Sequence, residues 1–147
     1  MTFVWRRWAD LSTDELYALL RLRAEVFVVE QDCPYLDLDG LDQGSWHAFQ
    51  YVDGTLAGYL RLLPAGLHHD DVAIGRVVTA PSHRRNGLGR PLMDEGYRKA
   101  RQLWGAVPVY LWAQSYLRPF YESLGYAVSG PEGVEDGIPH FPMLRRP

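Results

Sequence analysis

The chain has 147 residues, of which 47% are hydrophobic, and this is the usual size of a single domain with one core. Its net charge of −3 argues against a nucleic-acid partner. The lack of a long apolar run argues against a membrane span, and the first eight residues do not have the pattern of a secretory signal. We therefore expect a cytoplasmic protein. We expect one domain over residues 1–147.

The N-terminal part predicts a strand, a helix and an acidic loop. Residues 2–8 read as the strand. Ser12 and Glu15 have the spacing of a capping box, which predicts the start of a helix. Pro34 ends this helix because proline disfavours helical backbone in the residue before it. Residues 34–45 form the acidic loop.

Three strands are predicted next. Residues 46–52 and 55–63 are rich in β-forming side chains, and Asp53 and Gly54 between them favour a tight hairpin turn. Residues 72–79 form the third of these strands, which Pro81 follows closely.

The C-terminal part alternates helices and strands. We expect a helix over 87–104, a strand over 107–112, a short helix from about Arg118 to Leu124, and closing strands over 126–129 and 141–145. The full order is β-α-β-β-β-α-β-α-β-β. Strands four and five flank a helix of crossover length, so we expect them to be parallel neighbours. The fold class is α/β, with a mixed sheet in one domain.

The charges are unevenly distributed along the chain. Residues 24–60 contain no Lys or Arg but several carboxylates, whereas cations outnumber acids from Arg61 onward. The first region suits a cationic ligand and the second an anionic one, unless both are ordinary solvated surfaces. Cys33 is the only cysteine and lies among carboxylates, so we interpret it as structural rather than nucleophilic.

The segment after residue 79 has the chemistry of a diphosphate site. Gly87 and Gly89 allow a ligand to approach the backbone closely. The helix that begins here presents free N–H groups and the positive end of its dipole. Arg84 and Arg85 add two positive charges. A P-loop is excluded because there is no Gly-Lys pair, and a dinucleotide fingerprint is excluded because its third glycine is missing.

The pattern Arg-x-x-Gly-x-Gly after a strand resembles the acyl-CoA signature of the GNAT superfamily of N-acetyltransferases. Residues 120–126, Phe-Tyr-Glu-Ser-Leu-Gly-Tyr, resemble the second GNAT signature. Other segments resemble the ElaA-like family in particular, namely residues 28–35, 37–40, 74–77 and 135–140.

This resemblance implies a GNAT-like sheet whose strands four and five splay apart, and acetyl-CoA as the co-substrate without a metal. It implies Tyr121 as the general acid that protonates the leaving thiolate, although Tyr121 could instead only pack. Gln114 stands where many members have Asn, and Pro91 removes one N–H from the first helical turn. The implied cofactor-binding residues are Val77, Val78, Thr79, Arg84, Arg85, Asn86, Gly87, Leu88, Gly89 and Gln114.

The implied reaction is direct attack of a primary amine on the thioester in a ternary complex. An amine must first lose a proton, so a base or a water relay is needed, and the carboxylates of the acidic loop could also attract a cationic amine. The candidates for base or substrate binding are Glu30, Asp37, Asp39, His47 and His140. The histidines could equally be structural and the carboxylates merely solvated.

The acceptor is a small-molecule or peptide amine whose identity the sequence leaves open. Two alternatives stay open beside the enzyme. One is a non-catalytic acyl-CoA binding or sensing domain, and the other is a nucleic-acid binder that uses the C-terminal arginines. A homodimer is possible.

Overall fold

The computed structural model describes all 147 residues as eight strands and three α-helices. A π-helical segment, Ala24–Glu30, continues the first helix. The strands are β1 (Thr2–Arg7), β2 (Trp46–Val52), β3 (Thr55–Leu63), β4 (Val72–Thr79), β5 (Val109–Gln114), β6 (Ala127–Val128), β7 (Gly133–Glu135) and β8 (Ile138–Arg145). The α-helices are α1 (Thr13–Arg23), α2 (Gly89–Trp104) and α3 (Arg118–Glu122).

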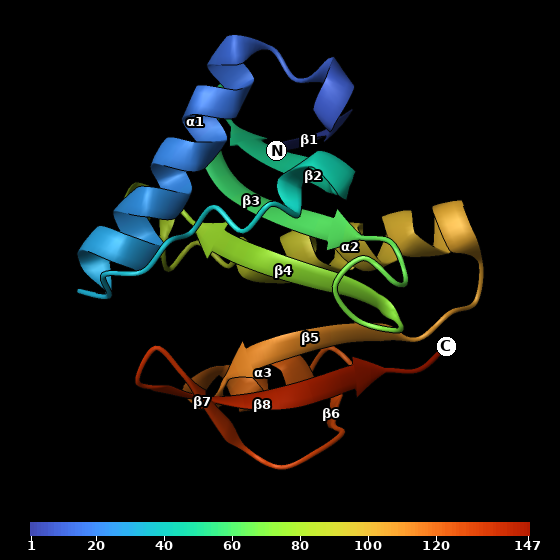
Figure 1. Cartoon of the computed structure of the whole chain (residues 1–147). Coiled ribbons are helices and arrows are strands. Elements are labelled where there is room, and N and C mark those ends of the chain that lie inside the picture. The colour runs from blue at the N-terminus through green and yellow to red at the C-terminus, as the bar shows by residue number, and fades with distance from the viewer.

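The strands form one sheet with helices on both faces. Its order is β1-β2-β3-β4-β5-β8-β6, and β7 pairs with β8. Figure 1 shows α1 on the near face and α2 and α3 on the far face. Neighbouring residues on a strand point to opposite faces, so Phe49 packs with the α1 residues and Ala48 packs with the α2 residues. The two cores therefore share β2 and β3.

The parallel strands β4 and β5 separate soon after they begin. Only two pairs join them, Val72 with Val109 and Ala73 with Tyr110. Figure 1 shows the two strands converging at their starts and apart at their arrowheads. The expected parallel and splayed arrangement is confirmed, and the gap leaves the C-terminal half of β4 without a partner on that side.

The α/β fold class is confirmed, and several boundaries are those expected. Ser12 and Glu15 form the capping box, and Asp53 and Gly54 adopt the positive φ angles that the hairpin turn needs. β2, β3 and β4 have the bounds expected from the sequence. None of the helices is long and apolar enough to cross a membrane.

Other expectations require correction. The strand expected over 107–112 occupies Val109–Gln114, and the helix expected from residue 87 begins at Gly89. β7 was not expected, because three residues are too few to show an alternating pattern. The Asp136-Gly137 turn that joins it to β8 is nevertheless a hairpin signal, with φ values of 51° and 78°.

Candidate functional site

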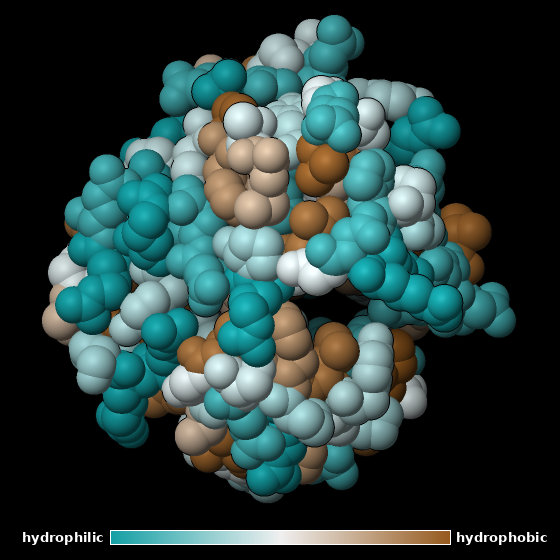
Figure 2. Space-filling model, turned by 180° about the vertical axis from the view of Figure 1, so that it is seen from behind, coloured by the Kyte–Doolittle hydropathy of each residue, from teal (hydrophilic) through white to brown (hydrophobic).

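A cleft of about 860 Å³ lies where β4 and β5 separate. Both strands line it, and further walls come from the segment after α1, the start of α2, α3 and the β7–β8 hairpin. Figure 2 shows, from behind, that the molecule is hollowed at its centre with hydrophobic residues beside the hollow. The fold itself therefore creates a site at the point where the sheet is incomplete.

One end of the cleft lies at the turn before α2. The N–H groups of Arg85, Asn86, Gly87 and Leu88 have no acceptor in the protein. Arg85 and Gly87 both have a φ of 68°, and a turn of this kind directs successive N–H groups toward one ligand. Since α2 has 16 residues, its dipole also favours an anion at this end.

Gly89 opens α2 at the edge of the cleft. A Cβ placed there would lie 3.4 Å from the Phe120 ring. This is an ordinary van der Waals distance, so a small side chain would fit, but its absence leaves the backbone at the start of the helix open to the cleft. The turn, the free N–H groups and this glycine together have the features of an anion-binding site.

Arg84 is already engaged in an ion pair. Its Nη2 lies 2.6 Å from Oε1 of Glu30, and its Nη1 lies 2.8 Å from Oε2. Glu30 is therefore not free to act as a base in this arrangement, and the pair fixes the turn against the end of the π-helical segment. Arg85 has no ion-pair partner in the protein and remains the free cation beside the turn.

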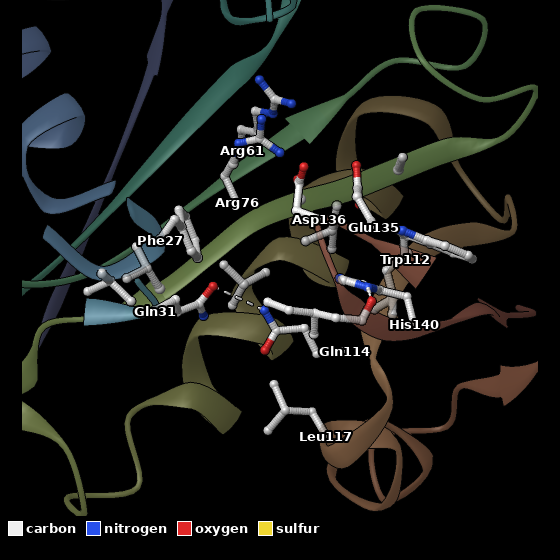
Figure 3. Close-up of a pocket in the computed structure, with 18 of the residues that line it drawn as sticks. Phe27, Gln31, Arg61, Arg76, Trp112, Gln114, Leu117, Glu135, Asp136 and His140 are labelled. Carbon is white, nitrogen blue, oxygen red and sulfur yellow. Dashed lines mark hydrogen bonds between the residues drawn. The ribbon is translucent and has the colours of Figure 1, made fainter. Parts of the chain in front are cut away.

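The predicted pantetheine residues lie along the middle of the cleft. Val77, Val78 and Thr79 line it beyond the last β4–β5 pair. Gln114 faces them from β5, and its Nε2 lies 3.4 Å from Oε1 of Gln31, a contact that crosses the cleft (Figure 3). An extended polar chain can therefore lie beside β4 in the gap.

Tyr121 places its hydroxyl at the cleft. The residue is 7% exposed, lines the cleft from α3, and its hydroxyl has no hydrogen-bond partner in the protein. Burial raises the pKa of Tyr121 to about 12. The phenol is therefore protonated at neutral pH and can donate a proton.

His140 provides a basic nitrogen on the opposite wall. Its Nδ1 lies 2.7 Å from the carbonyl oxygen of Ile138, which can only accept, so Nδ1 carries the hydrogen. The residue is 7% exposed, and its ring stacks on Trp112 with the centroids 5.4 Å apart. These contacts fix the tautomer and leave the lone pair on Nε2 without a partner in the protein.

The carboxylates of the acidic loop are held in a buried ionic network. Arg23, which is fully buried, contacts Asp37 and Asp42 at 2.8 Å each. Two further arginines complete the network, with contacts Arg61–Asp39, Arg61–Asp42, Arg76–Asp37 and Arg76–Asp39. The network fixes the loop to α1, β3 and β4.

These contacts argue against the roles suggested for Asp37 and Asp39. Burial opposes ionisation of Asp39, but hydrogen bonds from Arg61 outweigh it and hold the pKa of Asp39 well below its usual range. Asp39 lines the cleft as an arginine-bound anion, whereas Asp37 lies outside the lining. Neither carboxylate is free to take a proton or to attract a cationic amine.

His47 also requires correction. It is fully buried outside the cleft, and its two nitrogens contact the Tyr59 hydroxyl at 2.7 Å and the Asp42 carbonyl at 2.9 Å. Burial lowers the pKa of His47. The structural alternative fits this residue, and His140 is the histidine that reaches the cleft.

Almost the whole chain matches a known protein family. The model of the acetyltransferase (GNAT) domain matches residues 12–146. The chain belongs to the GNAT acetyltransferase family. The GNAT chain is 40% identical to protein ElaA of Escherichia coli over 139 residues, which cover 93% of this chain and 91% of ElaA.

Solved structures agree with this assignment. An acyl-CoA N-acyltransferase from Pseudomonas aeruginosa superposes on this GNAT domain with a TM-score of 0.93 and 45% identity over 98% of both chains. The structure of E. coli ElaA gives a TM-score of 0.92 at 38% identity, covering 99% of this chain and all of ElaA. The expected membership of the ElaA-like GNAT proteins is confirmed.

Sequence reasoning assigned no role to two cleft carboxylates, Glu135 and Asp136, or to the aromatic Trp112. Figure 3 shows these three residues with His140 on the hairpin side of the pocket. The Asp136-Gly137 turn signal could have located the hairpin. Its position over the cleft depends on the pairing of β8 with β5, which no local pattern predicts.

Proposed function

We propose that the chain transfers an acetyl group from acetyl-CoA to a primary amine by direct attack in a ternary complex. The observation that carries the proposal is the position of the cleft. It runs from Arg84 and Gly89, which flank the turn of unpartnered N–H groups, along the unpaired part of β4, to Tyr121 and His140. Family membership supports acyl transfer in general.

The turn and β4 fit the two parts of a CoA molecule. The free N–H groups of residues 85–88 and the Arg85 guanidinium bind the pyrophosphate, each charge-assisted hydrogen bond contributing about 1.5–3 kcal/mol. Val77, Val78 and Thr79 hydrogen-bond the pantetheine amides and polarise the thioester carbonyl. Gln114 turns its amide toward the same arm, after exchanging its long contact with Gln31 for one with the ligand.

His140 accepts a proton and Tyr121 donates one in the proposed reaction. An amine with a pKa of about 10.4 is protonated at pH 7, and removing that proton costs about 4–5 kcal/mol, so Nε2 of His140 accepts it. The free amine nitrogen then attacks the carbonyl carbon, a C–N bond forms and the C–S bond breaks. The Tyr121 hydroxyl donates its proton to the departing sulfur, and the tyrosinate is reprotonated through solvent by the proton that the new amide nitrogen releases.

Two measurements on the same protein test the proposal. Calorimetry measures binding of CoA, and thiol release from acetyl-CoA measures turnover with a range of primary amines. We expect micromolar or tighter CoA binding and amine-dependent thiol release. Binding without thiol release from any amine would favour the acyl-CoA binding or sensing domain, and an intact fold that does not bind CoA would refute both functions.

A further inference from the structure

Among the residues that line the cleft and their ion-pair partners, the charges cancel except on the β7–β8 hairpin, and the unpaired Arg85 lies at the turn outside this lining. Three arginines, Arg23, Arg61 and Arg76, balance the three carboxylates of the acidic-loop network. Arg84 balances Glu30. Glu135 and Asp136 also line the cleft, and neither has an ion-pair partner. Four cations against six carboxylates leave a net charge of 4 − 6 = −2, all of it on the β7–β8 hairpin.

The strand register places Glu135 and His140 on the same wall. Glu135 is opposite Ile138, and Gln114 is opposite His140. Residues directly opposite each other or two apart on a strand share a face, so Glu135, Ile138 and His140 point to one side. Because all three residues line the cleft, that side is the cleft side.

Aromatic rings occupy the same wall. Trp112 and Tyr110 lie two and four residues before Gln114 on β5, so they share its face. Trp112 stacks on His140, and a Cβ at Gly133 would lie 2.9 Å from the Trp112 ring, so this glycine makes room for the indole. The Tyr110 ring stacks on His69 with the centroids 3.7 Å apart, so one of its faces is covered and the other is available.

The distance between Glu135 and His140 can be estimated from strand geometry. Glu135 pairs two residues away from His140, which is about 7 Å along the strands and about 5 Å across them. His140 is more than nine-tenths buried, and its Nε2 has no partner in the protein. The wall thus has one nitrogen that accepts a proton and, on a residue whose Cα lies about 9 Å away, the carboxylate of Glu135, with that of Asp136 one residue further along the hairpin.

We propose that the acceptor is a diamine whose reacting amine lies at His140 and whose second ammonium group binds Glu135 and Asp136. The aromatic rings of Trp112 and Tyr110 line the path of the carbon chain, and the face of each ring that is not stacked on a histidine attracts ammonium groups. This inference rests on the proposed function, and it specifies the class of amine that the same site selects. It replaces the acidic loop with the hairpin as the part of the molecule that recognises positive charge.

The first test compares linear diamines of increasing length with monoamines of the same number of carbons, by thiol release from acetyl-CoA. We expect a lower KM for the diamine of each matched pair, by at least fivefold at the best length, and a preference that weakens as salt is added. Equal KM values for matched diamines and monoamines would overturn the inference and leave the proposed function intact. Absence of thiol release with every amine would instead refute the proposed function and, with it, the inference.

The second test removes the two charges. Glu135→Gln and Asp136→Asn keep the size of each side chain, and Asn tolerates the positive φ of 51° at residue 136. We expect each change to raise KM for the diamine about two- to fivefold, and both together about tenfold, with little change in KM for the monoamine.

Glu132→Gln is the matched control, because Glu132 lies in the same C-terminal region but does not line the cleft. It should leave both KM values unchanged. Equal effects of the two hairpin variants on diamine and monoamine would point to a structural role and would contradict the assignment.

Discussion

Gln50 of β2 donates a hydrogen bond from Nε2 to the carbonyl oxygen of Leu88 over 3.1 Å. This carbonyl belongs to the same peptide unit as the N–H of Gly89, so the contact fixes the direction of that N–H at the start of α2. Gln50 is fully buried, and a Cβ at Gly58 would lie 2.2 Å from its Oε1. The glycine therefore makes room for the glutamine that orients the proposed cofactor turn.

From this contact we expect Gln50→Met to weaken CoA binding. The loss of one neutral hydrogen bond corresponds to about 0.5–1.5 kcal/mol, or a rise in the CoA Kd of about two- to tenfold by calorimetry. The amine KM should not change. Gln102→Met, at an exposed position of α2, is the control. An unchanged Kd for Gln50→Met would show that the turn is oriented without it.

Arg23→Met should strongly destabilise the fold. Arg23 is fully buried between Asp37 and Asp42, and its removal leaves buried carboxylates with fewer cations. We expect a loss of about 3–5 kcal/mol in the free energy of unfolding, measured with urea. Arg21→Met on the same helix removes only an exposed pair with Glu25 and should cost less than about 0.5 kcal/mol. Similar losses for the two variants would contradict this view of the network.

The same network predicts a loss of stability in acid. Arginine contacts outweigh burial and lower the pKa of both Asp39 and Asp42 from the ordinary value of 3.8. Depressed carboxyl pKa values stabilise the folded state above the unfolded pKa, and this stabilisation is lost as the pH falls below it. Urea unfolding should show a falling free energy of unfolding from pH 5 to pH 3. Asp39→Asn should show a smaller fall over this range, whereas a fall as steep as that of the parent would contradict the assignment.

Tyr121→Phe should lower kcat about 10²-fold with little change in the KM for acetyl-CoA, because it removes the proton donor but keeps the ring. Burial disfavours the phenolate and raises the pKa of Tyr121 to about 12, so the phenol stays protonated even at pH 10. The parent should therefore show no loss of activity from Tyr121 ionisation below that pH. Full turnover by the variant would leave Tyr121 with a packing role only.

His140→Gln should lower kcat/KM most at neutral pH. The amine is then almost entirely protonated, and no side chain takes its proton. At alkaline pH the amine loses its proton to solvent, so the difference between variant and parent should narrow as the pH rises toward 10. A constant ratio of the two rates between pH 7 and pH 10 would show that His140 is not the base.

Local sequence patterns were sufficient for several elements of the fold. The capping box at Ser12, the Asp53-Gly54 hairpin and the Arg84–Gly89 segment each depend on residues close together in the chain, and the structure has the expected element at each position. The roles of Arg84 and Gly89 in binding CoA stay predictions. Such patterns encode only the arrangement of residues that are close together in the chain.

The charge distribution could not be interpreted from the sequence alone. Residues 24–60 contain no cation, but Arg23 and Arg61 lie immediately outside this window, and both turn back into its carboxylates. They come from α1 and β3, which only the tertiary fold brings together. The acidic-loop carboxylates Asp37, Asp39 and Asp42 are therefore balanced by arginines, whereas Glu135 and Asp136, on a hairpin near the end of the chain, line the cleft without a cation.

The two pairs between β4 and β5 are the only strand pairing between the four strands β1 to β4 and the part of the sheet built from β5, β8, β6 and β7. A molecule that occupies the gap and contacts both sides takes the place of the missing strand pairing. The unliganded domain should therefore hinge at Ala73 and Tyr110, and hydrogen exchange across this joint should slow when CoA is added. A molecule bound in the gap should therefore make the sheet more rigid.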